Sequence, residues 1–315
     1  MRHSYITVII ILMFLGTFSS NAQQDPQYTQ YMYNTQVVNP AYAGSRDVLS
    51  FGLLYRTQWV GFEGAPKTAT FTVNSPIGSL DNMGLGLSII RDEIGPAVES
   101  NVIVDYSYSI STSDKAEVSF GLKAGVDILD IDFTKLNIFD GNDIFEQNVD
   151  NKLQPQIGAG VYYNTDKFYA GLSVPNFLTT NHYDSSTLDD LNFDGDVAPA
   201  ERLHYFLIAG YVFDISENLK FKPATLVKAV SGSPLQWDVS GNFLINEKFT
   251  VGAAYRWSAA MSAMLGFQAS ENIFLGFGYD YQTTDIESYS DGSYEVMLRF
   301  DIPSKPDRVL TPRFF

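Results

Sequence analysis

The chain contains no cysteine among its 315 residues. Disulfides, thiolate metal sites and lipid anchoring through a cysteine are therefore excluded. An exported protein without disulfides fits the bacterial envelope. Histidine is also scarce, and beyond the N-terminal leader only His182 and His204 remain. Neither has partners at the spacing that a metal site or an acid–base pair needs, so no metal site is expected.

Positive charge is in short supply as well. The 20 Lys and Arg face 36 Asp and Glu, and the formal net charge is −16. This argues against nucleic acid as a partner, because nucleic-acid binding requires a basic surface. The glycine pairs in "GLGLSI" and "GFGYDY" lie within strand-like runs with no helix after them, unlike a nucleotide-binding loop. We expect no catalytic residue and no cofactor.

Long apolar runs are missing too. The run Tyr5–Phe18 is too short to span a bilayer as a helix. Arg2 precedes it, and Ser20 and Ala22 follow at cleavage-site positions, which predicts a signal peptide at residues 1–22. The rest of the chain has no run of 18 apolar residues, whereas aromatic residues reach 14%. A secreted β protein and an outer-membrane barrel both fit this composition.

Period-two alternation is the dominant pattern. In "NIFLGFGYDYQ", "AEVSFGLKAGVD" and "SYEVMLRFDI", apolar residues alternate with polar residues or glycine. Most runs are about 9–11 residues, the length of a tilted strand that crosses a bilayer. We count fourteen runs, beginning near Val48, Lys67, Met83, Ala97, Ala116, Pro155, Lys167, Arg202, Leu219, Leu235, Lys248, Ala260, Ile273 and Ser293. The fold predicted is all-β, a transmembrane antiparallel β-barrel of about 14 strands over residues 48–302.

The connections favour the barrel over a soluble sandwich. Tight polar turns such as "SDK", "NTDK" and "SEN" follow even-numbered runs, and longer connections follow odd-numbered ones. Short periplasmic turns and long external loops are typical of outer-membrane barrels. The connections after runs 2 and 11 depart from this rule. An even strand number places the tail at residues 303–315 in the periplasm.

The predicted inward faces carry charges of both signs, which indicates a wet, partly salt-bridged lumen. Glycines on these faces would leave lumen volume or ease strand coiling. Trp59 has two interpretations, an interfacial girdle residue or a contact at a binding rim or plug. The candidate lumen or mouth residues are Arg56, Gln58, Trp59, Arg256, Asp280 and Arg299.

Two acidic stretches, "FDGNDIFEQNVDN" and "DDLNFDGDVAPAE", are predicted to be solvated external loops. The first lacks the spacing and terminal glutamate of a calcium-binding loop. The alternative for both is a divalent cation bridging to the anionic lipid of the outer membrane.

Residues 23–47, which contain "QQDPQYTQYMYNTQVVNPAYAGS", show no lipid-type alternation and cannot join the barrel wall. They precede the first strand, so we expect the segment to begin in the periplasm. Tyrosines and amides could satisfy polar groups of the lumen, which predicts a plug; a disordered tether is the alternative. The candidate plug or gating residues are Asp25, Pro26, Tyr28, Tyr31, Tyr33, Asn39 and Pro40.

Four stretches resemble one family: "DPQYTQYMYN", "NPAYAGS", "YRTQWVGFEGAPKT" and "MGLGLSIIRDEIGP", with "PRFF" at the C-terminus. They are similar to PorP/SprF proteins, outer-membrane components associated with type IX secretion and gliding motility. The resemblance implies a fourteen-stranded barrel similar to long-chain fatty acid transporters, and no catalysis. It also implies two kinds of partner: secreted cargo with a C-terminal sorting domain, and periplasmic type IX or peptidoglycan-binding proteins.

The function expected from this resemblance is a cargo-binding anchor that assists secretion. The alternative is a passive channel or transporter for a small or apolar solute, since a barrel of this size has room for a ligand. A third, weaker interpretation is a soluble β-sandwich adhesin. The first two place the chain in the cell outer membrane.

Overall fold

The computed structural model describes residues 26–78, 82–135, 148–178, 203–230 and 233–303. The predicted signal peptide, nearly all of the C-terminal tail, most of the first acidic stretch and all of the second lie outside these residues, as does His182. In the described part of the chain, no helix is long and apolar enough to cross a membrane.

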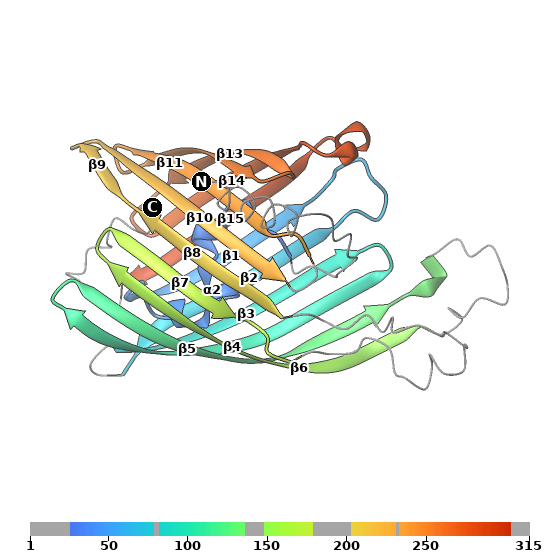
Figure 1. The fold of residues 1–315 in the computed structure, drawn as a ribbon, viewed down its shortest axis with the longest axis horizontal. Helices are drawn as coiled ribbons and strands as arrows, with labels where there is room; N and C mark the ends of the chain where they lie inside the picture. The colour runs from blue at the N-terminus through green and yellow to red at the C-terminus, as the bar shows by residue number, and fades with distance from the viewer. Residues whose placement is uncertain (1–25, 79–81, 136–147, 179–202, 231–232, 304–315) are drawn as a thin grey trace, which may run out of the picture.

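The strands form one closed antiparallel ring (Figure 1). β1 (Val48–Thr57) pairs with β2 (Lys67–Ile77) on one side and with β15 (Ser293–Pro303) on the other, which closes the sheet. Between them the strands follow in chain order: β3 (Met83–Ile94), β4 (Ala97–Ser113), β5 (Ala116–Ile131), β6 (Val149–Thr165), β7 (Phe168–Val174), β8 (His204–Tyr211), β9 (Phe213–Ser216), β10 (Leu219–Val230), β11 (Gln236–Ile245), β12 (Phe249–Arg256), β13 (Ala260–Gln268) and β14 (Ile273–Gln282). β8 and β9 both pair with β10, and Val212 alone separates them. They act as one strand, so the predicted fourteen-stranded barrel is confirmed.

The predicted strand starts agree with the structure to within two residues, except in β6. That strand begins at Val149, six residues before the predicted Pro155. β4, β5 and β6 have 17, 16 and 17 residues, longer than the lengths expected for most runs. β5 and β6, with the short helix η3 (Phe133–Lys135), reach past the other strands at the right of Figure 1. The extension carries polar residues such as Asp130 and Asp150, so apolar alternation could not reveal it.

The two faces of the ring differ as predicted. On β5, Phe120 and Leu122 point outward and are half exposed or more, whereas Ser119 and Lys123 point inward and are buried. Among the described strands, each one except β10 exposes large apolar side chains on its outer face, and the outward residues of β10 are partly buried. Buried charges line the inside. Only a lipid surround stabilises such an inverted arrangement, and lipid requires a closed sheet.

The connections distinguish the two ends of the barrel. The short-turn end holds tight turns such as Asp114–Lys115 and Asp166–Lys167. The long-loop end holds the connections over residues 58–66, 132–148 and 175–203, together with the short helix η4 (Asp285–Tyr289). The predicted alternation of short turns with long loops has one further exception, because β3 and β4 are joined at the long-loop end by only Gly95 and Pro96.

Candidate functional site: the segment inside the barrel

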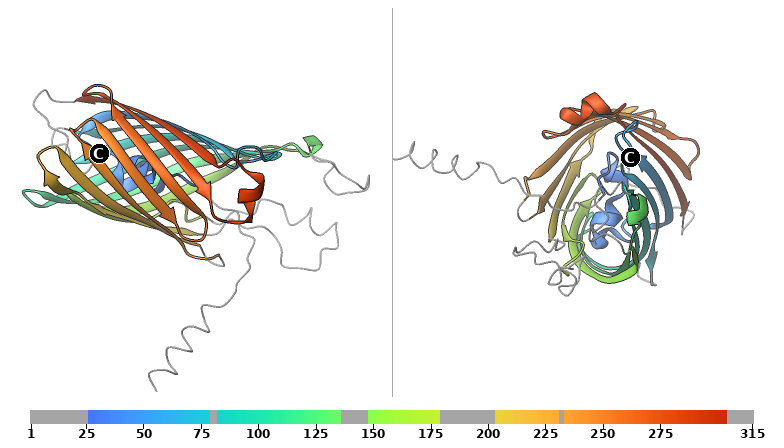
Figure 2. Two further views of the ribbon diagram at one scale, coloured as in Figure 1. Left: turned by 90° about the horizontal axis from the view of Figure 1, so that it is seen from above. Right: turned by 90° about the vertical axis from the view of Figure 1, so that its right-hand side faces the viewer.

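The N-terminal segment, defined here as Pro26–Asp47, lies inside the ring of strands, where Figure 2 shows it in blue. Its short helices are η1 (Tyr31–Tyr33), α2 (Thr35–Val38) and η2 (Pro40–Tyr42). Most of its side chains are buried, polar and apolar alike. The lumen is salt-bridged as predicted, for example between Arg56 and Asp280. The expectation of a wet lumen is wrong over this length, because side chains of the segment contact the buried inward charges.

The segment runs along the barrel from one end to the other. Thr29 contacts Asp280 and Glu295, which lie near the long-loop ends of β14 and β15. Arg46 contacts Asp301, near the short-turn end of β15. The first described residues thus lie at the long-loop end, whereas β1 begins at the short-turn end. This corrects the expectation that the segment begins on the periplasmic side.

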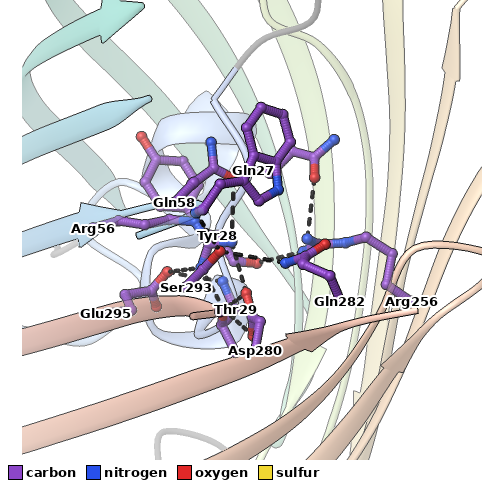
Figure 3. Close-up of polar contacts among 12 residues, drawn as sticks. Gln27, Tyr28, Thr29, Arg56, Gln58, Arg256, Asp280, Gln282, Ser293 and Glu295 are labelled. Atoms are coloured by element: carbon purple, nitrogen blue, oxygen red, sulfur yellow. Dashed lines mark hydrogen bonds and ion pairs between the residues drawn. The ribbon is translucent and has the colours of Figure 1, made fainter. Parts of the chain in front are cut away.

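Thr29, Arg56, Asp280 and Glu295 form the contact named here the Thr29 cluster (Figure 3). Arg56 donates from Nη1 to Thr29 Oγ1 and from Nη2 to Asp280 Oδ2, both at 2.6 Å. The Thr29 hydroxyl donates to Asp280 at 2.7 Å, and the Thr29 and Gln30 backbone N–H groups each donate to Glu295 at 2.8 Å. Since Arg56, Asp280 and Glu295 are at most 1% exposed, these charge-assisted bonds are shielded from water.

Arg256 holds the same end of the segment from β12. Its Nε donates to both carboxylate oxygens of Asp238, at 3.0 and 3.1 Å. Its terminal nitrogens donate to the Gln27 side chain at 3.0 Å and to the Tyr28 carbonyl at 3.2 Å. One guanidinium therefore joins a wall carboxylate to two residues of the segment.

Amide side chains hold the middle of the segment. Gln36 donates to Ser88 at 3.1 Å and to Asp105 at 3.3 Å, and accepts from Asn74 at 2.9 Å. Asn39 donates to the Val161 carbonyl at 3.1 Å and also caps η2 by accepting from the Ala41 N–H. Asn39, with Pro40 as the first residue of η2, starts the turn that the sequence predicted.

Inward-facing glycines make room for the segment's backbone. A Cβ on Gly121 would lie 2.1 Å from the Ala41 nitrogen, and one on Gly84 would lie 2.1 Å from the Ala43 carbonyl oxygen. Gly160 gives Asn39 the same room. These glycines were expected to leave lumen volume or ease coiling. At Gly84 and Gly160 the space is instead filled by the segment itself, which a side chain on the wall would exclude.

A second contact, named here the Tyr33 cluster, lies toward the short-turn end and comprises Tyr33, Arg46, Lys222, Arg299 and Asp301. Lys222 Nζ lies 4.9 Å and Arg299 Cζ 5.8 Å from the centre of the Tyr33 ring. Asp301 accepts from Arg46 at 2.6 Å and from Arg299 at 3.2 Å. Burial raises the pKa of Tyr33 to about 12, so its hydroxyl stays protonated at physiological pH.

Comparison with known families matches residues 20–300 to the type IX secretion system membrane protein family PorP/SprF. The chain belongs to this family. Together with the closed barrel, membership places the PorP/SprF chain in the outer membrane as a type IX secretion protein. Because outer-membrane barrels have short periplasmic turns and long external loops, the long-loop end lies outside the cell and the short-turn end in the periplasm.

Solved structures similar to this PorP/SprF chain are outer-membrane proteins of low sequence identity. Omp33 of Acinetobacter baumannii is 8% identical with a TM-score of 0.47, covering 82% of this chain and 100% of its own. The CymD monoaromatic hydrocarbon channel is 11% identical with a TM-score of 0.46, covering 87% and 92%. A Pseudomonas aeruginosa FadL homologue is 13% identical with a TM-score of 0.41, covering 88% and 95%. No curated protein matches the chain.

Most predicted site residues of this PorP/SprF barrel come together inside it. Tyr28, Tyr31, Asn39 and Pro40 are buried in the segment, and Tyr31 bonds Ser240 at 3.0 Å. Arg56, Arg256 and Asp280 meet at the extracellular end, whereas Arg299 lies at the periplasmic end. Asp25 lies outside the described residues.

The remaining predicted residues lie at the extracellular mouth. Gln58 accepts from Arg56 at 3.2 Å. The Trp59 N–H donates to Ser293 Oγ at 3.1 Å, and its side chain is half-buried beside a pocket of about 450 Å³ in the β1–β2 loop. Pro26 borders a separate cavity of about 70 Å³ between the segment and the wall. That volume suits a few water molecules.

Several residues that hold the segment were absent from the candidate site. Thr29, Gln30 and Gln36 carry no periodicity and no motif chemistry that would single them out. Glu295 was placed on the inward face by its alternation, but its partner could not be predicted. Lys222 lies in "KFKPATLVK", where lysine at every second position before Pro223 gave the only signal of an inward charge.

Proposed function

We propose that this PorP/SprF barrel binds or anchors secreted cargo at its extracellular end, through the cargo's C-terminal sorting domain, and that Pro26–Asp47 closes the lumen as a plug. Type IX secretion or peptidoglycan-binding proteins would bind the periplasmic end. The proposal assigns no catalysis and no cofactor to the chain.

The observation that carries the proposal is that the chain fills its own lumen along its length. Gln36, Asn39 and Ala41 pack on β3, β6 and β5, and both ends of the segment are bound to buried charges. A passive channel needs an open path, so this packing favours an anchor over the alternative of a channel for a small or apolar solute.

The direction of the segment supports a role for the extracellular end. Gln27 and Thr29 lie where a cargo domain would dock, and Arg56 links Thr29 through Gln58 to the β1–β2 loop. Docking on that loop would act on the part of the segment that is held by the Thr29 cluster. The plug would then respond to occupancy of the barrel mouth.

Cargo anchoring is tested by an inventory of surface proteins in cells that carry the wild-type gene, a deletion, or a chain lacking Gln24–Asn34. The expected result is loss of one protein or a small set with the C-terminal sorting domain in the deletion strain. An unchanged inventory in the deletion strain would contradict anchoring. Affinity purification in detergent, followed by mass spectrometry, would name the cargo and the periplasmic partners.

The position of the segment's first residues has its own test, because the chain has no cysteine of its own. Pro26→Cys should react with a membrane-impermeant maleimide on intact cells. Asp114→Cys, in an exposed turn at the periplasmic end, should react only after the outer membrane is permeabilised. The reverse pattern would show that the barrel ends have been assigned wrongly.

A further inference from the structure

The β1–β2 loop, residues 58–66, borders a pocket of about 450 Å³ at the extracellular mouth. The pocket lining combines the aromatic residues Trp59 and Phe62 with the carboxylates of Glu63 and Glu93. Phe62 is 49% exposed, although it lies in a loop and not on a lipid-facing strand. Pockets of about 300–1,000 Å³ that combine apolar and polar groups are typical of ligand sites.

Backbone hydrogen bonds hold this loop on both sides. Toward the β14–β15 connection, the Val60 N–H donates to the Gly292 carbonyl at 2.9 Å, and the Asp291 N–H donates to the Val60 carbonyl at 2.7 Å. Toward the β3–β4 turn, the Gly95 N–H donates to the Gly64 carbonyl at 2.9 Å. The pocket therefore has a pre-formed wall, and a partner that binds there need not order the loop first.

Trp59 adopts a backbone conformation that costs free energy. Its φ is 46°, in the left-handed region that bulky side chains rarely enter. Ser293, which is 0% exposed, accepts the Trp59 N–H at 3.1 Å and holds the residue there. Conformations of this kind persist where the surrounding structure fixes them, and they cluster at ligand sites.

The charge of the two barrel ends indicates what kind of group the pocket takes. The four longest connections at the extracellular end, residues 58–66, 132–148, 175–203 and 283–292, contain 14 acidic and 2 basic residues. The short-turn connections between strands contain 6 acidic and 3 basic residues. The extracellular mouth therefore attracts cationic partners and disfavours anionic ones.

The balance of charge is also negative at the pocket itself. Glu63 lines the pocket and Asp291 bonds its loop, and neither has an ion pair among the described residues. Glu93 pairs with Arg91 at 3.0 Å, and Lys67 is the basic residue of the lining. Three carboxylates and two cations leave room for one further positive group.

We propose that this pocket binds an arginine side chain of the secreted protein that docks at the mouth. A planar guanidinium stacks on aromatic rings and donates in pairs to carboxylates, which matches Trp59, Phe62 and Glu63. The inference rests on the proposed anchoring function and adds the chemistry by which the partner is selected. The acidic connections would steer the arginine to the pocket, so binding would weaken as the salt concentration rises.

The first test uses Trp59 as a reporter. Trp237→Phe with Trp257→Phe leaves Trp59 as the only tryptophan of the chain. The probes are acetyl-Arg-Arg-amide and its citrulline counterpart, which has nearly the same shape and no charge. They are added to the mature chain in detergent with EDTA, so that divalent cations do not compete. A saturable change in fluorescence is expected with the arginine probe alone, and any other pattern, including no response to either probe, would overturn the proposal.

Glu63→Gln in the same background should weaken binding of the arginine probe by about threefold or more, because a charge-assisted contact is lost. Glu271→Gln is the matched control, since Glu271 is an exposed glutamate at the short-turn end. This control should bind the probe as the parent does. Equal affinity of the two variants would also count against the arginine pocket.

Surface inventories separate this inference from the anchoring function. Cells with Glu63→Gln and Asp291→Asn should retain less of the cargo that the gene deletion loses. If the deletion loses cargo and the double variant retains all of it, the arginine pocket is wrong while anchoring stands. If the deletion loses no cargo, the anchoring function itself fails, whatever the probes show.

Discussion

The two ends of the N-terminal segment are held by different kinds of interaction, although β15 supplies partners to both. β15 provides Glu295 to the Thr29 cluster and Arg299 to the Tyr33 cluster. At the extracellular end, the Arg56 guanidinium donates to Thr29 at 2.6 Å, and Thr29 donates to the carboxylates of Asp280 and Glu295 at 2.7 and 2.8 Å. At the periplasmic end, cations face an aromatic ring at 4.9 and 5.8 Å. The first arrangement depends on direct charge pairing, and the second on ring faces and a shared carboxylate.

The largest effect is expected from Arg56→Met, which breaks the extracellular end. Asp280 and Glu295 would stay buried without the cation between them, at a cost of about 3–5 kcal/mol in the free energy of unfolding. Arg91→Met removes a pair whose side chains are 57% and 44% exposed, and should cost about 1 kcal/mol or less. Denaturant unfolding in detergent measures both variants, and equal losses would contradict the role given to Arg56.

Gly121→Ala should loosen the middle of the segment while both clusters keep their residues. Its Cβ would lie 2.1 Å from the Ala41 backbone nitrogen, and overpacking of this kind costs about 1–3 kcal/mol. Gly278→Ala is the control, because its nearest segment atom is 3.4 Å away, an ordinary contact. Limited proteolysis should cleave the segment faster in the first variant only. Comparable protection in both would argue against close packing.

Tyr33→Leu sharpens the contrast from the periplasmic end. Loss of the ring removes a face from Lys222 and Arg299, which should cost about 1–2 kcal/mol. Tyr33→Phe keeps the ring and should change stability by less than about 1 kcal/mol, since a phenyl face attracts cations similarly. Thermal unfolding of the two variants decides the matter. If Tyr33→Phe is as damaging as Tyr33→Leu, the hydroxyl and not the ring stabilises this end.

The smallest effect is a late step in alkaline titration. The pKa of Tyr33 is raised to about 12 in the folded chain, against about 10 for a free tyrosine. The neutral phenol therefore contributes stability that is complete below pH 10 and is lost as the pH rises through 12. Absorbance at 295 nm should show a tyrosine ionising near pH 12, and Tyr33→Phe should lack it. Ionisation of every tyrosine near pH 10 would mean that the ring is solvated.

The sequence predicted the wall of the barrel well because lipid imposes a period of two on each strand. Alternation placed Asp280 and Glu295 on the inward face, and β1 begins at the predicted Val48. The early start of β6 was missed because strands beyond the bilayer no longer need an apolar outer face.

The contents of the lumen were less predictable. Thr29 and Asp280 are 251 positions apart, and nothing in the short, aperiodic segment indicates which wall residue it meets. Its tyrosines and amides were correctly expected to suit a polar lumen, and Tyr31 and Asn39 do bond there. Its direction depends on the Thr29 and Tyr33 clusters, which form only when fourteen strands bring distant charges together.

Single-channel conductance in planar bilayers tests the proposed plug most directly. The intact mature chain is compared with one lacking Gln24–Asn34, after heat-modifiable gel migration has shown that both barrels are closed. The account predicts no current above background for the intact chain and steady conductance for the shortened one, which lacks Thr29 and Tyr33. Equal conductance in the two chains would contradict it.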